Sequence, residues 1–440
     1  MQTPTHGEWT PVQKFLFRFS CCFFLIYIFP FPLDSIPFTN EISSWHEKLI
    51  KWYFAVFDFY SGLWHKLIPW VGEHILRLQT KITIFTNGSG DTTYDYVVLL
   101  TYFSLAVFAA IIWTVIDKNR KSYNTAYQWL RILVRYYVGS MMLVYGIIKI
   151  FHLQMPSPGI TALVQPFGDK SPMGVAWSFV GSSKAFSAFT GWAETISGIL
   201  LFFRRTTTLG ALLGATVMGN IVAINFCYDV PVKLFSSVLF LMLLFLVAPD
   251  ARRLLNILFL NKSTEPIDTS FNFNKRWQRV TRVVLKWAFI LYAFYSNIST
   301  DIKSEKIYGD TRPKVPLYGL YHTVMVIRNK DTVPPLTTDT TRWKRLAIEY
   351  TNFAQIQLMN DSASYYHFIP DTASKTVTIY SDKDTANKSK FIYLSDSNYL
   401  SLRGRIKNDS VYIRFRRFDL NAFRLLSRGF HWVNEYPYNR

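Results

Sequence analysis

Six polar residues lie in or beside apolar segments of this chain, where polar side chains are costly and therefore informative. They are Lys149, Glu194, Asn220, Asn225, Asp229 and Lys233. A carboxyl group can hold a proton, an ammonium group can stabilise negative charge, and amides donate hydrogen bonds. We predict catalytic roles for Lys149 and Glu194 and ligand-binding roles for the other four, and we expect no metal site.

The depths of these residues in the membrane indicate that they share one layer. Glu194 lies about eight residues inside its helix, roughly 12 Å deep, and Asn220 lies about six residues inside, roughly 9 Å deep. Lys149 ends one predicted helix and Lys233 begins another. Asn225 and Asp229 belong to "NFCYDVPVK" (225–233), which joins the helix predicted at 207–226 to the helix predicted at 234–249. The layer therefore predicts a pocket that opens on the outer side of the membrane.

A structural interpretation competes with the functional one. A Lys149–Glu194 pair can hold two helices together, and an asparagine such as Asn220 can serve helix packing. Asp229 and Lys233, at a helix boundary, can be solvated. Cys227 is isolated and Cys21 and Cys22 are adjacent, so no CxxC pair exists and their roles stay open.

The elements that position these residues are membrane helices. The chain has 440 residues, 50% of them hydrophobic, and a net charge of +19. Apolar blocks that suit a hydrocarbon core of ~30 Å fill the sequence up to about residue 300. Many basic residues flank these blocks and no nucleic-acid motif is present. We therefore predict a polytopic membrane protein that contacts lipid and does not bind nucleic acid.

We expect about seven crossings, near 15–34, 96–116, 128–150, 186–203, 207–226, 234–249 and 283–298. Basic clusters precede the first and seventh of these helices and follow the second, fourth and sixth. The positive-inside rule then places the N-terminus in the cytoplasm and the C-terminal region in the periplasm, across a bacterial inner membrane. Arg131 and Arg135 are interpreted as interfacial anchors.

These patterns divide the chain into four parts. Residues 1–127 hold N-terminal helices and an amphipathic outer segment at 37–95, and 128–261 form a four-helix core. A cytoplasmic loop, the last helix and a linker occupy 262–309, and an extracytoplasmic β domain occupies 310–440. In that domain "TVTIY" (376–380) and "VYIRF" (411–415) alternate apolar and polar residues. About eight short strands between 317 and 417 predict an antiparallel meander closed into a small barrel. The basic, aromatic tail after it can pack on the barrel or lie on the membrane.

The segment 128–261 resembles the DoxX family of bacterial membrane proteins. The resemblance rests on "VYGIIKIF", with its G-x-x-K of Gly146 and Lys149, and on "FTGWAETISGILLFFRRTTTLGALL", with the E-x-x-x-G of Glu194 and Gly198 and an R-R turn. It implies a four-helix membrane core and a link to thiol or sulfur oxidoreductase systems that use quinone. The outer segment and the terminal "RGFHWVNEYP" are similar to longer proteins of this type, which carry a C-terminal β domain.

Two functions of different classes follow. The first is a quinone-linked membrane subunit that receives electrons from a redox partner protein, because the sequence contains no haem, flavin or iron–sulfur motif. The lack of paired cysteines on the outer side argues against direct disulfide chemistry. In it Glu194 exchanges protons, Lys149 stabilises charge, and Asn220 or Asn225 donates hydrogen bonds. The alternative is a non-catalytic envelope protein that binds a lipid or a protein partner through its β domain. No inverted repeat favours a transporter.

Overall fold

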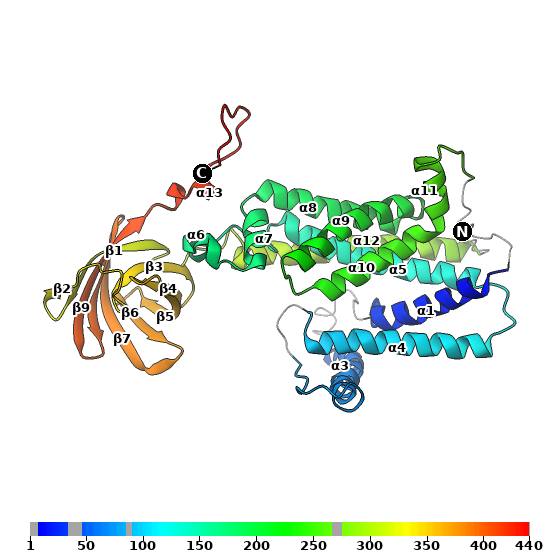
Figure 1. The fold of residues 1–440 in the computed structure, drawn as a ribbon, viewed down its shortest axis with the longest axis horizontal. Coiled ribbons are helices and arrows are strands. Elements are labelled where there is room, and N and C mark those ends of the chain that lie inside the picture. Colours follow the sequence, from blue (N-terminus) through cyan, green and yellow to red (C-terminus); the bar gives the residue numbers. More distant parts are fainter. Residues whose placement is uncertain (1–7, 34–45, 85–89, 266–274, 440) are drawn as a thin grey trace. The chain divides into compact units, whose positions relative to one another are not determined.

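The computed structural model describes residues 8–33, 46–84, 90–265 and 275–439. The chain divides into a unit formed by Met1–Gln154 with Ala185–Lys303 and a unit formed by Met155–Lys184 with Ser304–Arg440. The first unit is helical, and strands dominate the second (Figure 1). The second unit takes in Met155–Lys184, a segment that the sequence-based division assigns to the four-helix core.

Among the described residues of the helical unit, six helices are long and apolar enough to cross a membrane. They are α1 (Pro11–Ile28), α4 (Thr93–Ile116), α5 (Asn124–Ile150), α8 (Lys184–Phe202), α9 (Thr207–Cys227) and α10 (Lys233–Val247), the last continued by α11 (Ala251–Leu258). Their bounds confirm five of the predicted crossings to within four residues, whereas α1 ends at Ile28, just before Pro30, and the crossing predicted there extends to residue 34, outside the described part. The chain is a multi-pass integral membrane protein whose helices contact lipid.

The seventh predicted crossing, near 283–298, forms part of α12 (Arg276–Tyr308). This helix is not among the six apolar helices found in the described part, and Lys286 interrupts its apolar stretch. Nevertheless Ile290 of α12 is buried in a cluster with Leu143 of α5 and Phe202 of α8. Six of the about seven predicted crossings are therefore found among the described residues, and a crossing by α12 stays a prediction.

Local sequence signals set where the membrane helices begin. At α1, the Thr10 hydroxyl accepts a hydrogen bond from the backbone N–H of Gln13, and the Gln13 side-chain oxygen accepts one from the backbone N–H of Thr10. Thr92 and Asp95 form the same capping box at α4. Such caps satisfy backbone donors that the first turn of a helix leaves unpaired.

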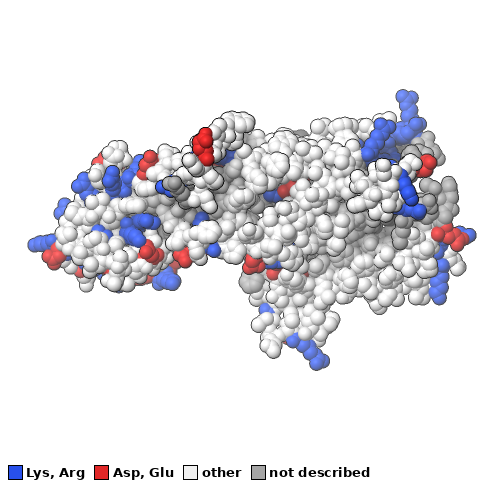
Figure 2. Space-filling model, turned by 45° about the horizontal axis from the view of Figure 1, so that its top comes forward, with Lys and Arg blue, Asp and Glu red and all other residues white. Residues whose placement is uncertain are grey.

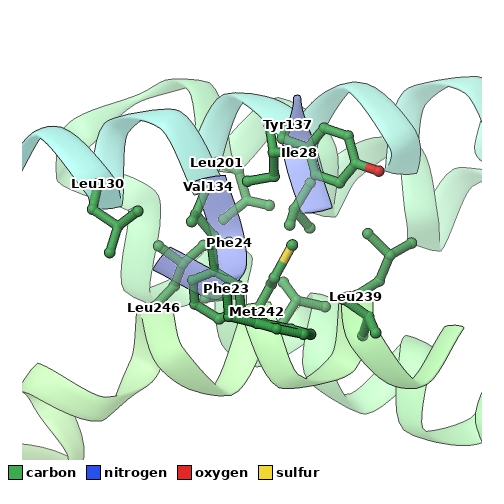
Figure 3. Packing of buried hydrophobic residues seen from close by; sticks show 14 of the residues in the cluster. Phe23, Phe24, Ile28, Leu130, Val134, Tyr137, Leu201, Leu239, Met242 and Leu246 are labelled. Carbon is green, nitrogen blue, oxygen red and sulfur yellow. The ribbon is translucent and has the colours of Figure 1, made fainter. Parts of the chain in front are cut away.

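An apolar core joins α1, α5, α8 and α10 (Figure 3). Its labelled members are Phe23, Phe24, Ile28, Leu130, Val134, Tyr137, Leu201, Leu239, Met242 and Leu246. These side chains recur at helical spacing within each helix, so one stripe of each helix faces the others. Packing of these stripes fixes the positions of the helices that carry the candidate site.

Helix α3 (Glu47–Trp70) belongs to the predicted outer segment and is continued by the π-helical turn η2 (Val71–Ile75). Figure 1 shows α3 nearly end-on beside α4, so its axis runs across the bundle. The rings of Trp64 on α3 and Tyr102 on α4 meet edge to face, 4.9 Å between centroids, while Trp52 is 77% exposed. This is typical of an interfacial helix. Residues 37–45 and 85–89 of the predicted segment lie outside the described residues.

The second unit contains a closed antiparallel β-barrel, as predicted. The strands are β1 (Gly319–Arg328), β2 (Asp331–Thr332), β3 (Trp343–Tyr350), β4 (Phe353–Leu358), β5 (Ala363–Asp371), β6 (Thr376–Ser381), β7 (Asp384–Ser395), β8 (Tyr399–Ile406) and β9 (Asp409–Phe418). Each of β3 to β9 pairs with the next, and β1 pairs with both β3 and β9, which closes the barrel. The short β2 pairs with the end of β1. Val411, Ile413 and Phe415 of β9 point inward and are buried, so side chains fill the interior.

The segment 155–184 belongs to the same unit as the barrel and contacts it at Ile160, which is buried together with Leu320 and Ala347. It contains α6 (Ile160–Val164), the 3₁₀ turn η3 (Phe167–Asp169) and α7 (Pro172–Gly181). The Glu349 carboxylate of β3 accepts a hydrogen bond from the backbone N–H of Thr161 at 3.4 Å and lies 3.7 Å from the Arg312 guanidinium. Burial raises the pKa of Glu349 above its usual range, and the hydrogen bonds from this segment and the Arg312 charge oppose the shift.

The start of the C-terminal tail also packs on the barrel. It forms the turn η6 (Leu420–Ala422) and the short helix α13 (Arg424–Ser427). Leu420 and Phe423 pack against a buried cluster that contains Leu320 of β1. Trp432, further along, is 91% exposed.

Candidate functional site

Helices α5 and α8 approach each other through four glycines that face the opposite backbone. A Cβ on Gly198 would lie 2.8 Å from the Gly139 carbonyl oxygen, and one on Gly146 would lie 2.7 Å from the Gly191 carbonyl oxygen. On each helix the two glycines are two turns apart and share one face. Small residues of this kind let membrane helices come into close contact. We call this contact, made by Gly139, Gly146, Gly191 and Gly198, the glycine seam.

The two predicted catalytic residues lie together beside the glycine seam. Lys149 follows Gly146 and Glu194 follows Gly191, each by almost one turn, so both side chains leave the seam in the same region. The Lys149 ammonium group forms an ion pair and hydrogen bond with Oε1 of Glu194. Lys149 is 6% exposed and Glu194 1% exposed, so the pair is shielded from solvent.

One oxygen of this buried carboxylate has no hydrogen-bond partner among the described residues. Lys149 binds Oε1 of Glu194, whereas Oε2 and the neighbouring Thr195 hydroxyl are buried and unpaired. The charge of Glu194 also acts on the phenol of Tyr145, one turn before Lys149. A buried polar atom without a partner costs about 1–3 kcal/mol, so it calls for an explanation. Chemically, Oε2 can accept a hydrogen bond or a proton from a ligand.

Asn225 and Asn220, both on α9, face different surroundings. The Asn225 side chain is 3% exposed and donates a 3.0 Å hydrogen bond to the Ser236 hydroxyl of α10. Asn220 is exposed on the surface of α9. Asn225 thus links two helices, while Asn220 points away from the bundle.

Asp229 and Lys233 lie at the start of α10. The Lys233 ammonium group is 2.7 Å from Oδ1 of Asp229 and 3.9 Å from Oδ2 of Asp91. The Asp91 carboxylate also accepts hydrogen bonds from the backbone N–H groups of Lys233, at 2.7 Å, and Leu234, at 3.0 Å. Asp91 therefore caps α10. The sequence analysis did not single out Asp91, because no apolar or charge pattern links it to the start of α10, more than 140 residues further along the chain.

The six predicted residues thus occupy separate places. Lys149 and Glu194 form one pair, Asp229 and Lys233 another, and within the described residues no hydrogen bond or ion pair joins the two pairs or links either to Asn220 or Asn225. The shared depth is compatible with the geometry, but direct contact exists only within the pairs. A role for each residue in ligand binding stays a prediction.

The cysteines are all free thiols. Cys21 and Cys22 lie on α1, and Cys227 is exposed at the end of α9. Across residues 8–33, 46–84, 90–265 and 275–439, no cluster of three or more His, Cys, Asp or Glu side chains could hold a metal ion. In the described part, Lys149 and Glu194 are therefore the charged pair most deeply buried among the membrane helices.

Comparison with known proteins gives one informative relationship. No protein-family model matches the chain. No solved structure matches it. The chain is, however, 32% identical over 135 residues to Uncharacterized protein YwoB of Bacillus subtilis (strain 168), a match that covers 31% of this chain and 83% of YwoB. Because the match spans most of the relative, the chain belongs to the same protein family as YwoB.

Proposed function

We propose that this chain is a DoxX-like membrane subunit of a thiol or sulfur oxidoreductase system, in which Glu194 exchanges protons with a membrane quinone. The observation that carries this proposal is the buried Glu194 carboxylate, with one oxygen paired to Lys149 and the other without a partner. The DoxX resemblance supports it, because the residues of its G-x-x-K and E-x-x-x-G patterns form the glycine seam and the ion pair.

The residues of the pair have complementary roles in this proposal. A quinone that becomes a quinol takes up electrons and protons, and a partner protein would supply the electrons. Glu194 would deliver a proton through Oε2, and the Lys149 ammonium group would offset the negative charge that remains on the carboxylate. The exposed amide of Asn220 would meet a ligand that arrives from lipid, while Asn225, Asp229 and Lys233 would line its polar end.

The glycine seam limits how such a ligand can approach. Because α5 and α8 are in backbone contact at Gly146 and Gly191, no ligand fits between them at that level. The approach would come from the exposed surface of α8, where Phe189 and Trp192 are 67% and 51% exposed. Aromatic side chains and a few convergent polar groups suit a flat ligand with polar oxygens.

The test is to identify what co-purifies with the full chain in mild detergent. Absorbance and mass spectrometry should find stoichiometric quinone with the wild type and none with Glu194→Gln. Tyr123→Phe is a matched control, because it removes a buried hydrogen-bonding group that contacts Arg18 at 2.7 Å, away from the pair. Absence of quinone from the wild type, or equal amounts in the wild type and Glu194→Gln, would contradict the proposal.

The orientation belongs to the same proposal. We infer a cytoplasmic N-terminus, a periplasmic barrel and a bacterial inner membrane location. Figure 2 shows Lys and Arg side chains gathered at one end of the helical unit. At this end the Lys121 ammonium group pairs with Glu8 at 2.7 Å, which ties the start of the chain to the α4–α5 connection. Positive charge of this kind marks the cytoplasmic side.

The barrel supports a second candidate function, binding of an acidic partner such as a lipid surface or an envelope protein. Its interior is filled by side chains, so a partner must bind outside. Arg403 and Arg405 of β8 and Arg414 and Arg416 of β9 are exposed on the outer face of neighbouring strands. The Arg414 guanidinium also lies 4.4 Å from the centroid of the Tyr399 ring.

This second function predicts salt-dependent binding of anionic vesicles. The full chain in nanodiscs of phosphatidylcholine should bind phosphatidylglycerol vesicles, and binding should weaken as salt screens the charges. The Arg403→Ser/Arg414→Ser variant should bind less. Equal binding of the variant and the wild type would contradict the role of this face.

A further inference from the structure

The helical unit contains a cavity of about 350 Å³ that neither Lys149 nor Glu194 lines. It lies between the first half of α5, the start of α9 and the first half of α12. Arg135 and Lys149 are both on α5 and are separated by about 21 Å along the helix axis. The cavity therefore stands at the basic end of the bundle, away from the proposed quinone site.

Positive charge dominates the walls of this cavity. Five cationic side chains line it, namely Arg131, Arg135, Arg204, Arg282 and Lys286. The lining also includes the carboxylate of Asp250, but that group has other partners. Its Oδ2 accepts a 2.6 Å hydrogen bond from the Thr208 hydroxyl, and its Oδ1 pairs with the Arg253 guanidinium at 2.8 Å.

The two arginines of α5 keep unused hydrogen-bonding capacity. Arg131 donates to the Leu246 carbonyl oxygen at 3.3 Å, and Arg135 donates to the Thr207 hydroxyl at 3.1 Å. Both Nε atoms are buried without a partner within the described residues. The guanidinium of Arg135 is also repelled by the positive charges of Arg131 and Arg204. Such an arrangement is stabilised when an anion binds among the cations.

Apolar side chains form a large part of the remaining walls, beside Gln128, Thr207 and Thr208. Trp129 and Ile132 of α5 and Val283 and Trp287 of α12 contribute them. Trp129 is 51% exposed and Trp287 47% exposed, so apolar side chains stand at the outer surface of the bundle beside the cations. A ligand that fits both surfaces carries an anionic group and an apolar part.

We propose that this cavity binds the phosphate group of an anionic phospholipid. Arginine forks match phosphate oxygens, and basic pockets between membrane helices bind phospholipid headgroups. The tryptophans and the α12 side chains would contact the start of the acyl chains. A free phosphate compound would satisfy the cations and leave the apolar walls unused, which favours the lipid as the source of the phosphate.

Native mass spectrometry of the full chain tests this proposal. The protein in detergent is titrated with phosphatidylglycerol, phosphatidylcholine or inorganic phosphate. The wild type should retain phosphatidylglycerol in preference to phosphatidylcholine. The Arg131→Gln/Arg135→Gln variant should bind it about tenfold more weakly or worse, because charge-assisted hydrogen bonds are lost. Arg282→Gln/Lys286→Gln provides a second variant on the more exposed wall, should the first not fold.

The matched control is Arg205→Gln/Arg252→Gln. It removes the same charge from exposed positions at the same end that do not line the cavity. Its affinity for phosphatidylglycerol should stay within about twofold of the wild-type affinity. If the control and the cavity variants lost the same affinity for phosphatidylglycerol, the proposed site would be wrong. It would also be wrong if the wild type bound phosphatidylcholine as tightly as phosphatidylglycerol. Inorganic phosphate that binds while the lipid does not would overturn the lipid assignment.

Discussion

The Lys149–Glu194 pair allows its structural and functional roles to be separated by a double-mutant cycle. The variants are Lys149→Met, Glu194→Met and the double variant, because the unbranched methionine side chain approximates the volume of both residues. Each single change leaves one charge buried without its partner. The double change removes both charges and leaves an apolar contact beside the glycine seam.

The magnitudes follow from burial. With exposed fractions of 6% and 1%, neither remaining charge can reach water. Each single variant should therefore lose roughly 3–5 kcal/mol of stability. The double variant should be close to the wild type or up to about 4 kcal/mol more stable, as when an apolar contact replaces a buried ion pair. The coupling free energy between the two sites should then be about 6 kcal/mol or more, since neither single loss recurs in the double variant.

The assay measures stability and ligand content on the same samples. Unfolding of the full chain in mixed detergent and SDS micelles, followed by tryptophan fluorescence, gives the free energies. Mass spectrometry gives the quinone content. We expect the double variant to regain stability and to lack quinone. A double variant that loses as much stability as the two single variants together would refute the ion-pair reasoning. A stable double variant that retains quinone would show that the pair only links the two helices.

Three further predictions concern other parts of the molecule. Gly146→Ala should lose about 1–3 kcal/mol of stability through overpacking against α8, whereas Gly62→Ala, whose added Cβ has open space, serves as the control in the same unfolding assay. Burial raises the pKa of Glu349, so its ionised form opposes folding and stability is lost as pH rises through the folded pKa. Thermal unfolding should therefore show that Glu349→Gln is more stable, relative to the wild type, at about pH 7 than at about pH 4. The same stability difference between variant and wild type at both pH values would contradict this. A crossing by α12 is tested with single cysteines introduced into a cysteine-free chain. If α12 crosses the membrane, Gly429→Cys should react with an impermeant maleimide added outside spheroplasts and Lys118→Cys should not. The same reactivity at both cysteines would place residues 118 and 429 on one side of the membrane.

The sequence by itself was sufficient for the class of protein and the positions of most elements. Apolar blocks predicted six helices, five of them to within four residues, because hydropathy and length are local properties. Alternation in segments such as 411–415 predicted the strands of the barrel for the same reason. The seventh predicted crossing stays a prediction, because Lys286 lowers the hydropathy of α12.

Only the tertiary structure decided which polar residues meet. Sequence fixes the depth of a residue along its helix, but packing sets the rotation of the helix about its own axis. Glu194 therefore faces Lys149 and Asn220 faces outward, although all three were expected to share a layer. Asp91 caps α10 from a segment 142 residues away in the chain. The cationic cavity likewise combines residues from four distant segments, and such long-range contacts depend on how the whole chain folds.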